Sequence, residues 1–324
     1  MRHHVPTIRI TDVSPRDGLQ NESKLVATQD KAALAGLLLA AHVDELELTS
    51  FVSPKWVPQL GDAALVCELV AKDLFANTSA AAAHGRTCIS ALAPNDKGLA
   101  ALLAANAACM QAHGHPLLHK VSIFTAASES FAQKNTNASI AQTIERFAPM
   151  VEDAHASGLL VRGYISCAIA CPFEGPILPA HVREVAEQLI ALGVDEIDLG
   201  DTIGAATPAT TRALLHDFAD LIALPPQEAP SGDEYAFTLH LHDTFGQAGE
   251  CIREALALGV RSFDGSVAGL GGCPYASTPG KPAPGNVATE LITSIAREMG
   301  FACGVDEHRL KQAAMFARGI VGKN

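Results

Sequence analysis

Two histidines lie two residues apart at the end of an apolar run, in the sequence FTLHLH at 237–242. In a β-strand, residues i and i+2 lie on the same face, about 6.5 Å apart. His240 and His242 would therefore direct two imidazoles to one point, while Leu239 and Leu241 would face the opposite side. This pair predicts a divalent metal site. The alternative is two polar histidines on a solvated strand face.

A carboxylate would complete a mixed nitrogen and oxygen ligand set. Asp17 is the best candidate, because it follows a predicted strand in a turn next to Gly18; a structural turn without a metal is the alternative. Magnesium and manganese favour octahedral, oxygen-rich sites, whereas zinc favours tetrahedral nitrogen and sulfur ligands. Arg16 has a permanent charge that could fix a carboxylate or stabilise an enolate oxygen, or could form a surface ion pair.

Two further acidic residues lie in or just after predicted strands. Asp201 could contact the substrate or a metal-bound water, or act in proton transfer, although it could instead cap the following helix. If the strands close into a barrel, Glu47 would point into its mouth. The simpler interpretation there is an ion pair with Arg16. Chemistry in such barrels lies at the carboxyl ends of the strands, which is where these residues are expected.

Cys273 lies in a segment rich in glycine and proline that runs from Gly269 to Asn286. Glycines permit unusual dihedral angles and mobility, which suit a lid that closes over a reaction. A thiol on such a lid could act as an acid or a nucleophile, or could be inert; with an unperturbed pKa of about 8.5 it is protonated at neutral pH. Asn286 could supply an amide oxygen to a metal, cap the last helix, or do both.

The elements that must position these residues follow a repeating pattern, in which β-type runs alternate with helical segments eight times. The predicted strands are 8–13, 45–49, 87–93, 120–126, 161–168, 196–201, 236–242 and 262–266. The predicted helices include 28–42, 97–113, 139–157, 179–192, 207–224, 247–258 and 286–299, with one extra helix at 306–321. Four of these helices are followed by a glycine stop, at Gly158, Gly193, Gly259 and Gly300.

Alternation of this kind implies a parallel sheet, and eight units imply closure as a (β/α)8 TIM barrel. We expect a single domain over residues 1–324, with the barrel at about 7–300 and a helical extension at about 301–324. The stretch 225–233 is the most loop-like part of the chain, but it is too short to be a linker between domains.

The composition limits the partners of the protein. The 324 residues carry a formal charge of −12, and no cluster of Lys and Arg is present, so nucleic acid is not expected. The apolar stretch 99–110 is too short and too rich in alanine to cross a bilayer, so no membrane is expected either. The eight cysteines are scattered and no secretory segment precedes the first strand, which predicts a cytoplasmic protein.

Several of these motifs together resemble the 3-hydroxy-3-methylglutaryl-CoA lyase family, from about residue 7 to about residue 310. The matching segments are SPRDGLQNE at 14–22, LTSFVSPKWVPQ at 48–59, RGYISCAIACPFEG at 162–175, GDTIG at 200–204, HLHDTFGQ at 240–247 and GLGGCPYA at 269–276. The arginine–aspartate pair and the two histidines belong to a wider group of metal-dependent carbon–carbon lyases and synthases on TIM barrels. The second and last of the segments are far more specific to the lyase.

The resemblance implies a role for each matching position. Four residues resemble the ligands of the divalent cation, Mg²⁺ or Mn²⁺: Asp17, His240, His242 and Asn286. Arg16 resembles the residue that binds substrate and stabilises the thioester enolate, and Cys273 the catalytic cysteine of a mobile loop. Glu47 and Asp201 match further acids of the active site. The family likeness implies an acyl-CoA substrate, cleaved to acetoacetate and acetyl-CoA, and a homodimer.

Two departures from the family pattern leave alternatives open. Twelve residues separate Cys273 from Asn286, about four more than is usual in the family, which puts the role of Asn286 and the choice of acyl group in doubt. The chain also lacks the late cysteine of some members, so redox control between subunits is not expected. The alternatives are a lyase acting on a related 3-hydroxyacyl-CoA and a barrel that binds metal and acyl-CoA without turnover. A condensing synthase of the isopropylmalate type is less expected, because it would carry a further C-terminal domain.

Overall fold

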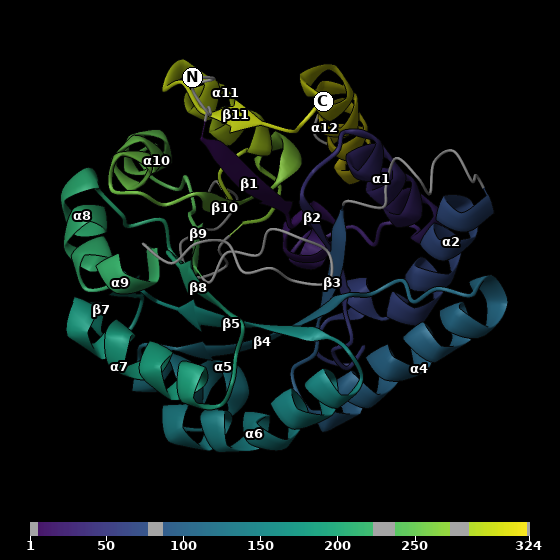
Figure 1. Ribbon diagram of the computed structural model, residues 1–324, viewed down its shortest axis with the longest axis horizontal. Helices are drawn as coiled ribbons and strands as arrows, with labels where there is room; N and C mark the ends of the chain where they lie inside the picture. Colours follow the sequence, from purple (N-terminus) through teal and green to yellow (C-terminus); the bar gives the residue numbers. More distant parts are fainter. Residues whose placement is uncertain (1–5, 77–86, 223–236, 273–284, 323–324) are drawn as a thin grey trace, which may run out of the picture.

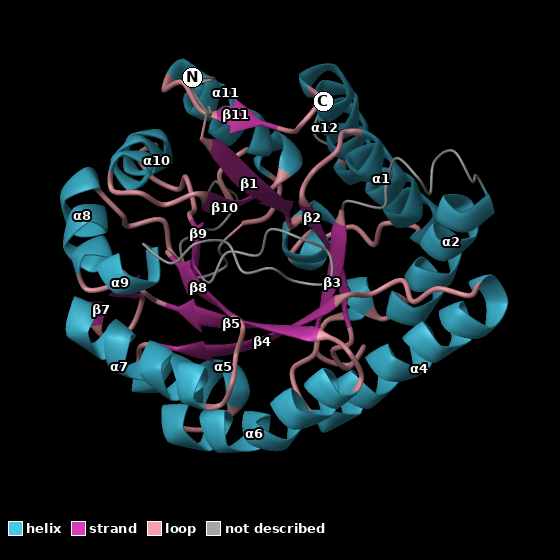
Figure 2. Cartoon of the chain, in the orientation of Figure 1, coloured by secondary structure: helices cyan, strands magenta, loops and turns pink. Residues whose placement is uncertain are grey.

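A closed barrel of eight parallel strands forms the centre of the molecule, and helices surround it (Figure 1, Figure 2). The computed structural model describes residues 6–76, 87–222, 237–272 and 285–322. The strands of the barrel are β1 (Thr7–Asp12), β2 (Glu45–Ser50), β3 (Cys88–Leu92), β4 (Lys120–Ala126), β5 (Leu160–Ser166), β8 (Glu196–Gly200), β9 (Phe237–His240) and β10 (Ser262–Gly265). Pairing between β10 and β1 closes the barrel, which confirms the predicted fold class.

The helices follow the strands in the expected alternation. They are α1 (Thr28–Ala40), α2 (Ala63–Ala76), α4 (Asp96–His113), α5 (Glu129–Thr136), α6 (Ile140–Ala156), α7 (Pro179–Ala191), α8 (Pro208–His216), α9 (Ala219–Ile222), α10 (Ala248–Ala257), α11 (Thr289–Glu298) and α12 (Glu307–Val321). The predicted helix 207–224 is in fact two helices, and α2 and α5 lay outside the predicted set. None of the helices within the described ranges is both long enough and apolar enough to cross a membrane.

Glycines end several of these helices as their positions in the sequence predicted. Gly158, Gly193, Gly259 and Gly300 all have positive φ angles, between 75° and 103°. A residue with a Cβ pays a steric cost in this left-handed conformation, whereas glycine does not. The helices therefore stop at defined points, and the chain turns back into the barrel.

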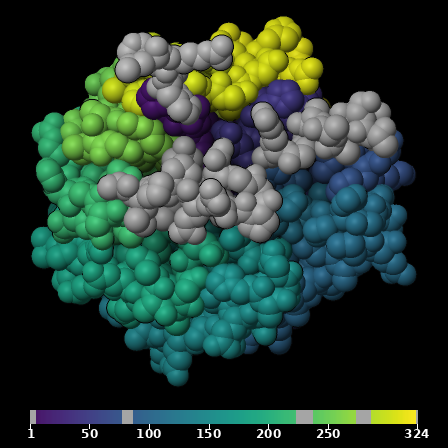
Figure 3. All heavy atoms as spheres, in the orientation of Figure 1, coloured from purple at the N-terminus to yellow at the C-terminus, as the bar shows by residue number. Residues whose placement is uncertain are grey.

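The two ends of the described chain meet on one side of the barrel. A short strand, β11 (Ala302–Cys303), pairs in parallel with the start of β1. The purple N-terminal part and the yellow C-terminal part accordingly lie side by side in Figure 3. The extra helix expected near the C-terminus is α12, which packs against α1.

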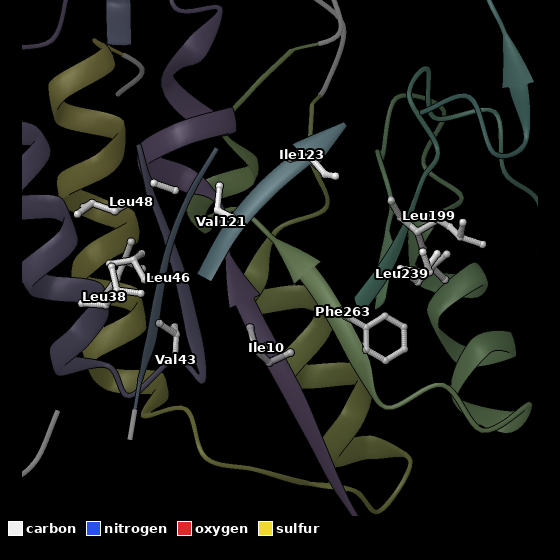
Figure 4. Close-up of a cluster of buried hydrophobic side chains, with 14 of the residues drawn as sticks. Ile10, Leu38, Val43, Leu46, Leu48, Val121, Ile123, Leu199, Leu239 and Phe263 are labelled. Atoms are coloured by element: carbon white, nitrogen blue, oxygen red, sulfur yellow. The ribbon is translucent and has the colours of Figure 1, made fainter. Parts of the chain in front are cut away.

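Apolar side chains of the strands point outward, to the helices. Ile10, Leu46, Val121 and Leu199 belong to one buried cluster, in which Leu38 of α1 lies beside Leu46 (Figure 4). The strands alternate between apolar and polar residues, so the polar residues must face the interior of the barrel. This differs from the usual barrel interior, which bulky branched side chains fill.

Charged side chains occupy much of that interior and pair with one another. The ammonium group of Lys120, which has no exposed surface, lies 2.8 Å from Glu45 Oε2 and 2.5 Å from Glu196 Oε2. Arg162 Nη2 lies 2.8 Å from Glu196 Oε1 and 3.2 Å from Glu45 Oε2, and Arg9 also pairs with Glu45. Charges removed from water in this way persist only when they are paired, because the cost of desolvation is large.

Replacing Lys120 with methionine should destabilise the protein severely. The substitution keeps the length of the side chain but leaves two buried carboxylates with fewer counter-charges. We expect the free energy of unfolding to fall by about 3 to 5 kcal/mol in urea denaturation. Arg212→Met is the control: Arg212 is 54% exposed and pairs with Glu254 at the surface, so its loss should leave stability nearly unchanged. Equal effects of the two variants would contradict this account of the barrel interior.

Candidate metal centre

Three predicted ligands meet at the carboxyl ends of the barrel strands. Ligand atoms of Asp17, His240 and His242 all lie within 4.8 Å of one another. Asp17 follows β1, whereas His240 is the last residue of β9, so the closure of the barrel brings together residues that are far apart in the sequence. The two imidazole rings lie 5.3 Å apart, measured between their centroids.

The strand that carries the two histidines is shorter than predicted. The strand expected at 236–242 ends at His240, so His242 lies beyond the strand, although the two imidazoles converge as predicted. His242 instead forms an isolated antiparallel bridge with Asn286, supported by hydrogen bonds from Asp243 N to Gly285 O and from Val287 N to Leu241 O. This bridge places Asn286 directly opposite His242.

Asn286 holds its side-chain oxygen free for a cation. Its Nδ2 donates to Asp17 Oδ2 at 2.8 Å and to the carbonyl of Leu270 at 3.1 Å. Both partners can only accept, so the amide orientation is fixed. Among the described residues, the buried Oδ1 of Asn286 has no hydrogen-bond partner, and the same is true of Nδ1 of His242. Asn286 does not cap α11, the helix predicted at 286–299, because the N-cap of α11 is Ala288.

The turn that carries Asp17 is a single π-helical turn, η1 (Ser14–Gly18), in which Gly18 N donates to Val13 O. Such turns often occur at functional sites. Ser14 Oγ donates to Asp12 Oδ1 at 2.5 Å and accepts from Val267 N at 2.7 Å. These bonds tie the turn to the chain that follows β10, so both sides of the centre are fixed to each other.

Electrostatic interactions keep Asp17 ionised. Burial opposes ionisation, but the charge of Arg16 and the two nearby histidines outweigh it and lower the pKa of Asp17 to about 2. Burial, and then the charge of His240, lowers the pKa of the His242 ring to about 4. Asp17 is therefore a carboxylate and His242 a neutral imidazole at neutral pH, which are the forms that ligate metals.

Arg16 and Glu47 form the ion pair predicted at the mouth of the barrel, and the contact is buried, which excludes the alternative of a surface ion pair for Arg16. Arg16 Nε lies 2.5 Å from Glu47 Oε2, and its Nη1 lies 2.5 Å from Asp17 Oδ1. The guanidinium also lies 5.3 Å from the ring centroid of Tyr164. Arg16 is only 7% exposed, so these contacts hold a permanent positive charge beside the candidate metal ligands.

Asp201 lies near the centre but is bound to the backbone. Its two carboxylate oxygens accept from Ala205 N and Ala206 N, both at 2.9 Å, before α8 begins. The N-cap of that helix is Thr207, so Asp201 stabilises the preceding turn and not the helix end. Burial raises its pKa to about 6, although the two N–H bonds partly offset this effect. Cys273, the remaining predicted residue, lies outside the described residues.

Two residues that face the barrel interior contact His240 but were not among the predicted site residues. Asp264 of β10 accepts from His240 Nδ1 at 3.0 Å, and Tyr164 of β5 packs edge-on against the His240 ring. Both positions alternate with outward-facing apolar residues along their strands. The alternation is visible in the sequence, but it does not show which interior residue lies beside His240.

The donor set fits a divalent cation. One carboxylate and two imidazoles converge, and the amide of Asn286 is hydrogen-bonded to that carboxylate. The four side chains come from three separate segments, and two of their buried polar atoms have no partner within the described chain. Carboxylate, amide and imidazole groups are all donors that bind divalent metal ions in proteins.

Comparison with known proteins gives one consistent family. The family model described as HMGL-like matches residues 7–316. The chain is 41% identical to the mitochondrial hydroxymethylglutaryl-CoA lyase of Bos taurus over 309 residues, which are 95% of this chain and 84% of that protein. It is 40% identical to the 3-hydroxy-3-isohexenylglutaryl-CoA/hydroxy-methylglutaryl-CoA lyase of Pseudomonas aeruginosa, over 98% of this chain and 94% of that protein.

A solved structure agrees with both sequence matches. The crystal structure of the HMG-CoA lyase from Brucella melitensis superposes with a TM-score of 0.83 at 39% sequence identity. The match covers 98% of this chain and 99% of that one. The similarity therefore extends over the barrel and the C-terminal helix together.

His242→Ala should abolish tight binding of Mn²⁺, measured by isothermal titration calorimetry. The substitution removes one of the converging ligands, and since outer partners of ligands alone contribute about 10- to 100-fold in affinity, we expect a loss of more than about 100-fold. His181→Ala, which changes an exposed histidine on α7, should bind like the wild type. Unchanged affinity in His242→Ala would exclude this cluster as the metal centre.

Proposed function

The chain belongs to the HMGL-like family, and from that premise we propose that it is a lyase that cleaves 3-hydroxy-3-methylglutaryl-CoA to acetoacetate and acetyl-CoA. The single observation that carries the proposal is the meeting of Asp17, His240 and His242 beside the buried Arg16. Cleavage of this substrate needs a site that acidifies a tertiary hydroxyl and another that stabilises an enolate. The centre offers both within one small volume.

Asp17, His240, His242 and Asn286 would hold the divalent cation, Mg²⁺ or Mn²⁺. When bound, the cation supplies a Lewis acid that lowers the pKa of the substrate hydroxyl and orients its oxygens. Asp17 contributes the negative charge, and Nδ2 of Asn286 holds that carboxylate in place. Because His242 is neutral at neutral pH, it needs no deprotonation before it can bind.

Arg16 would stabilise the enolate oxygen of acetyl-CoA. When the tertiary hydroxyl loses its proton, the carbon that bears it becomes a ketone carbon. The adjacent carbon–carbon bond then breaks and leaves its electron pair on the acetyl-CoA fragment. A fixed positive charge in a buried site stabilises such an oxyanion without reorganising solvent. Glu47 and Tyr164 contribute by holding the guanidinium in place, since both contact it.

Two proton transfers complete the reaction. The hydroxyl proton passes to Asp201 or to a histidine of the centre; a pKa of about 6 favours Asp201, whereas its two backbone N–H bonds favour the histidines. Cys273 then protonates the carbon of the enolate to give acetyl-CoA. Family likeness alone supports this role of Cys273 and a homodimer, whereas the free, scattered cysteines support a cytoplasmic protein.

A second candidate is a lyase acting on a 3-hydroxyacyl-CoA with a larger group at carbon 3. Two observations favour it: the Pseudomonas relative is named for two substrates, and the segment between Cys273 and Asn286 is longer than the family usually has. The two candidates share the same catalytic residues and differ only in the acyl group that the site accepts.

The purified protein with Mg²⁺ or Mn²⁺ should release acetoacetate from 3-hydroxy-3-methylglutaryl-CoA, and EDTA should stop the reaction. The same assay with a 3-isohexenyl analogue separates the two candidate substrates by their kcat/KM values. Absence of product from every member of this panel, while calorimetry still detected metal and acyl-CoA binding, would identify a non-catalytic binding barrel instead.

Cys273→Ala should lower kcat by about 100- to 10,000-fold, the range that general acid catalysis supplies. Mn²⁺ affinity should stay at the wild-type value, because the thiol is not among the proposed ligands. Cys303→Ala is the matched control, since Cys303 lies in β11, which pairs with the start of β1 at the opposite end of that strand from the metal centre. Full activity in Cys273→Ala would remove the proposed acid from the mechanism.

A further inference from the structure

A buried carboxylate lies directly behind one of the candidate ligands. Asp264 Oδ2 accepts from His240 Nδ1 at 3.0 Å and from the hydroxyl of Tyr164 at 3.2 Å. Asp264 Oδ1 accepts from Arg162 Nη1 at 3.2 Å. The carboxylate is 1% exposed, so no solvent competes for these three donors.

These contacts fix which nitrogen of His240 carries the proton. Arg162 can only donate, and the tyrosine hydroxyl donates to the same oxygen that faces the imidazole. A carboxylate has no proton to give, so His240 must donate from Nδ1. The lone pair of Nε2 is then free to bind a metal ion.

We propose that Asp264 is a positioning residue of the metal centre: it selects the tautomer of His240 that presents Nε2 to the cation and holds the ring in that orientation. The inference rests on the metal centre of the proposed function. It concerns a residue that touches neither cation nor substrate and acts through its hydrogen bond to His240. Within the described residues, His242 Nδ1 has no comparable partner, so His240 is the ligand whose orientation the protein fixes.

The hydrogen-bond pattern predicts what an asparagine would do at this position. Arg162 would still require an acceptor, so the amide oxygen would face the guanidinium. The amide nitrogen would then face His240 and donate to Nδ1. That bond favours the tautomer with its proton on Nε2, which blocks the atom needed by the cation. The nearly isosteric change would thus reverse the chemical effect of the residue.

Asp198 of β8 provides a matched control. It is fully buried, lies in the barrel interior beside the same arginine, and its Oδ2 is 3.6 Å from Arg162 Nη1. A carboxylate oxygen of Asp198 also lies within 4.8 Å of a carboxylate oxygen of Asp264 and of a ring nitrogen of His240. The hydrogen bond to His240, however, comes from Asp264. Asp198→Asn therefore makes the same chemical change beside Asp264 without removing a hydrogen bond to His240.

Titration of Mn²⁺ into the wild type and both variants tests the proposal. We expect Asp264→Asn to raise the dissociation constant by about 10- to 100-fold, the usual effect of losing an outer partner of a metal ligand, and Asp198→Asn to change it by less than about threefold. Melting temperatures in EDTA report any general loss of stability. Affinity unchanged in Asp264→Asn, or weakened equally in both variants, would overturn the proposal. A wild type that bound no Mn²⁺ would instead reject the metal centre itself.

A second measurement needs no variant of Asp264. In metal-free wild-type protein with ¹⁵N-labelled histidine, long-range proton–nitrogen spectra distinguish the two neutral tautomers, and the His240→Gln variant assigns the signal. We expect the proton of neutral His240 on Nδ1. A proton on Nε2 would overturn the proposal even if Asp264→Asn failed to fold.

Discussion

The pairing of charges inside the barrel is the constraint on which the rest of the structure depends. Lys120 and Arg162 form ion pairs with Glu45 and Glu196 in the interior, where an unpaired charge would cost several kcal/mol. Apolar packing holds the strands to the helices on the outside, but it does not fill the centre. The interior is therefore a connected network rather than a set of independent contacts.

The metal centre continues this network at the carboxyl ends of the strands. Arg162 contacts Glu196 on one side and Asp264 on the other, and Asp264 in turn contacts His240. A candidate metal ligand is thus linked through three hydrogen-bonded groups to the middle of the barrel. Rigid support of this kind suits catalysis, because the charges that stabilise the enolate must already be in position when the bond breaks.

Closure of the barrel supplies the other half of the site. Asp17 and Asn286 are 269 residues apart in the sequence, yet Asn286 donates a hydrogen bond to Asp17 because β1 pairs with β10. Ser14 adds a second link between the same two regions through Val267. The turn after β1 and the chain after β10 are therefore fixed to each other by hydrogen bonds.

The sequence by itself determined the barrel and most of the candidate residues of its metal centre. Strand alternation, glycine stops and the pair His240 and His242 were sufficient, because each is a local pattern with a direct physical meaning. The tertiary structure alone decided how those residues meet. His242 is held by a bridge to Asn286 beyond the strand end. Only the structure shows that Asp264 lies behind His240 and accepts its hydrogen bond. Contacts between distant segments depend on register and closure, which no local window of sequence contains.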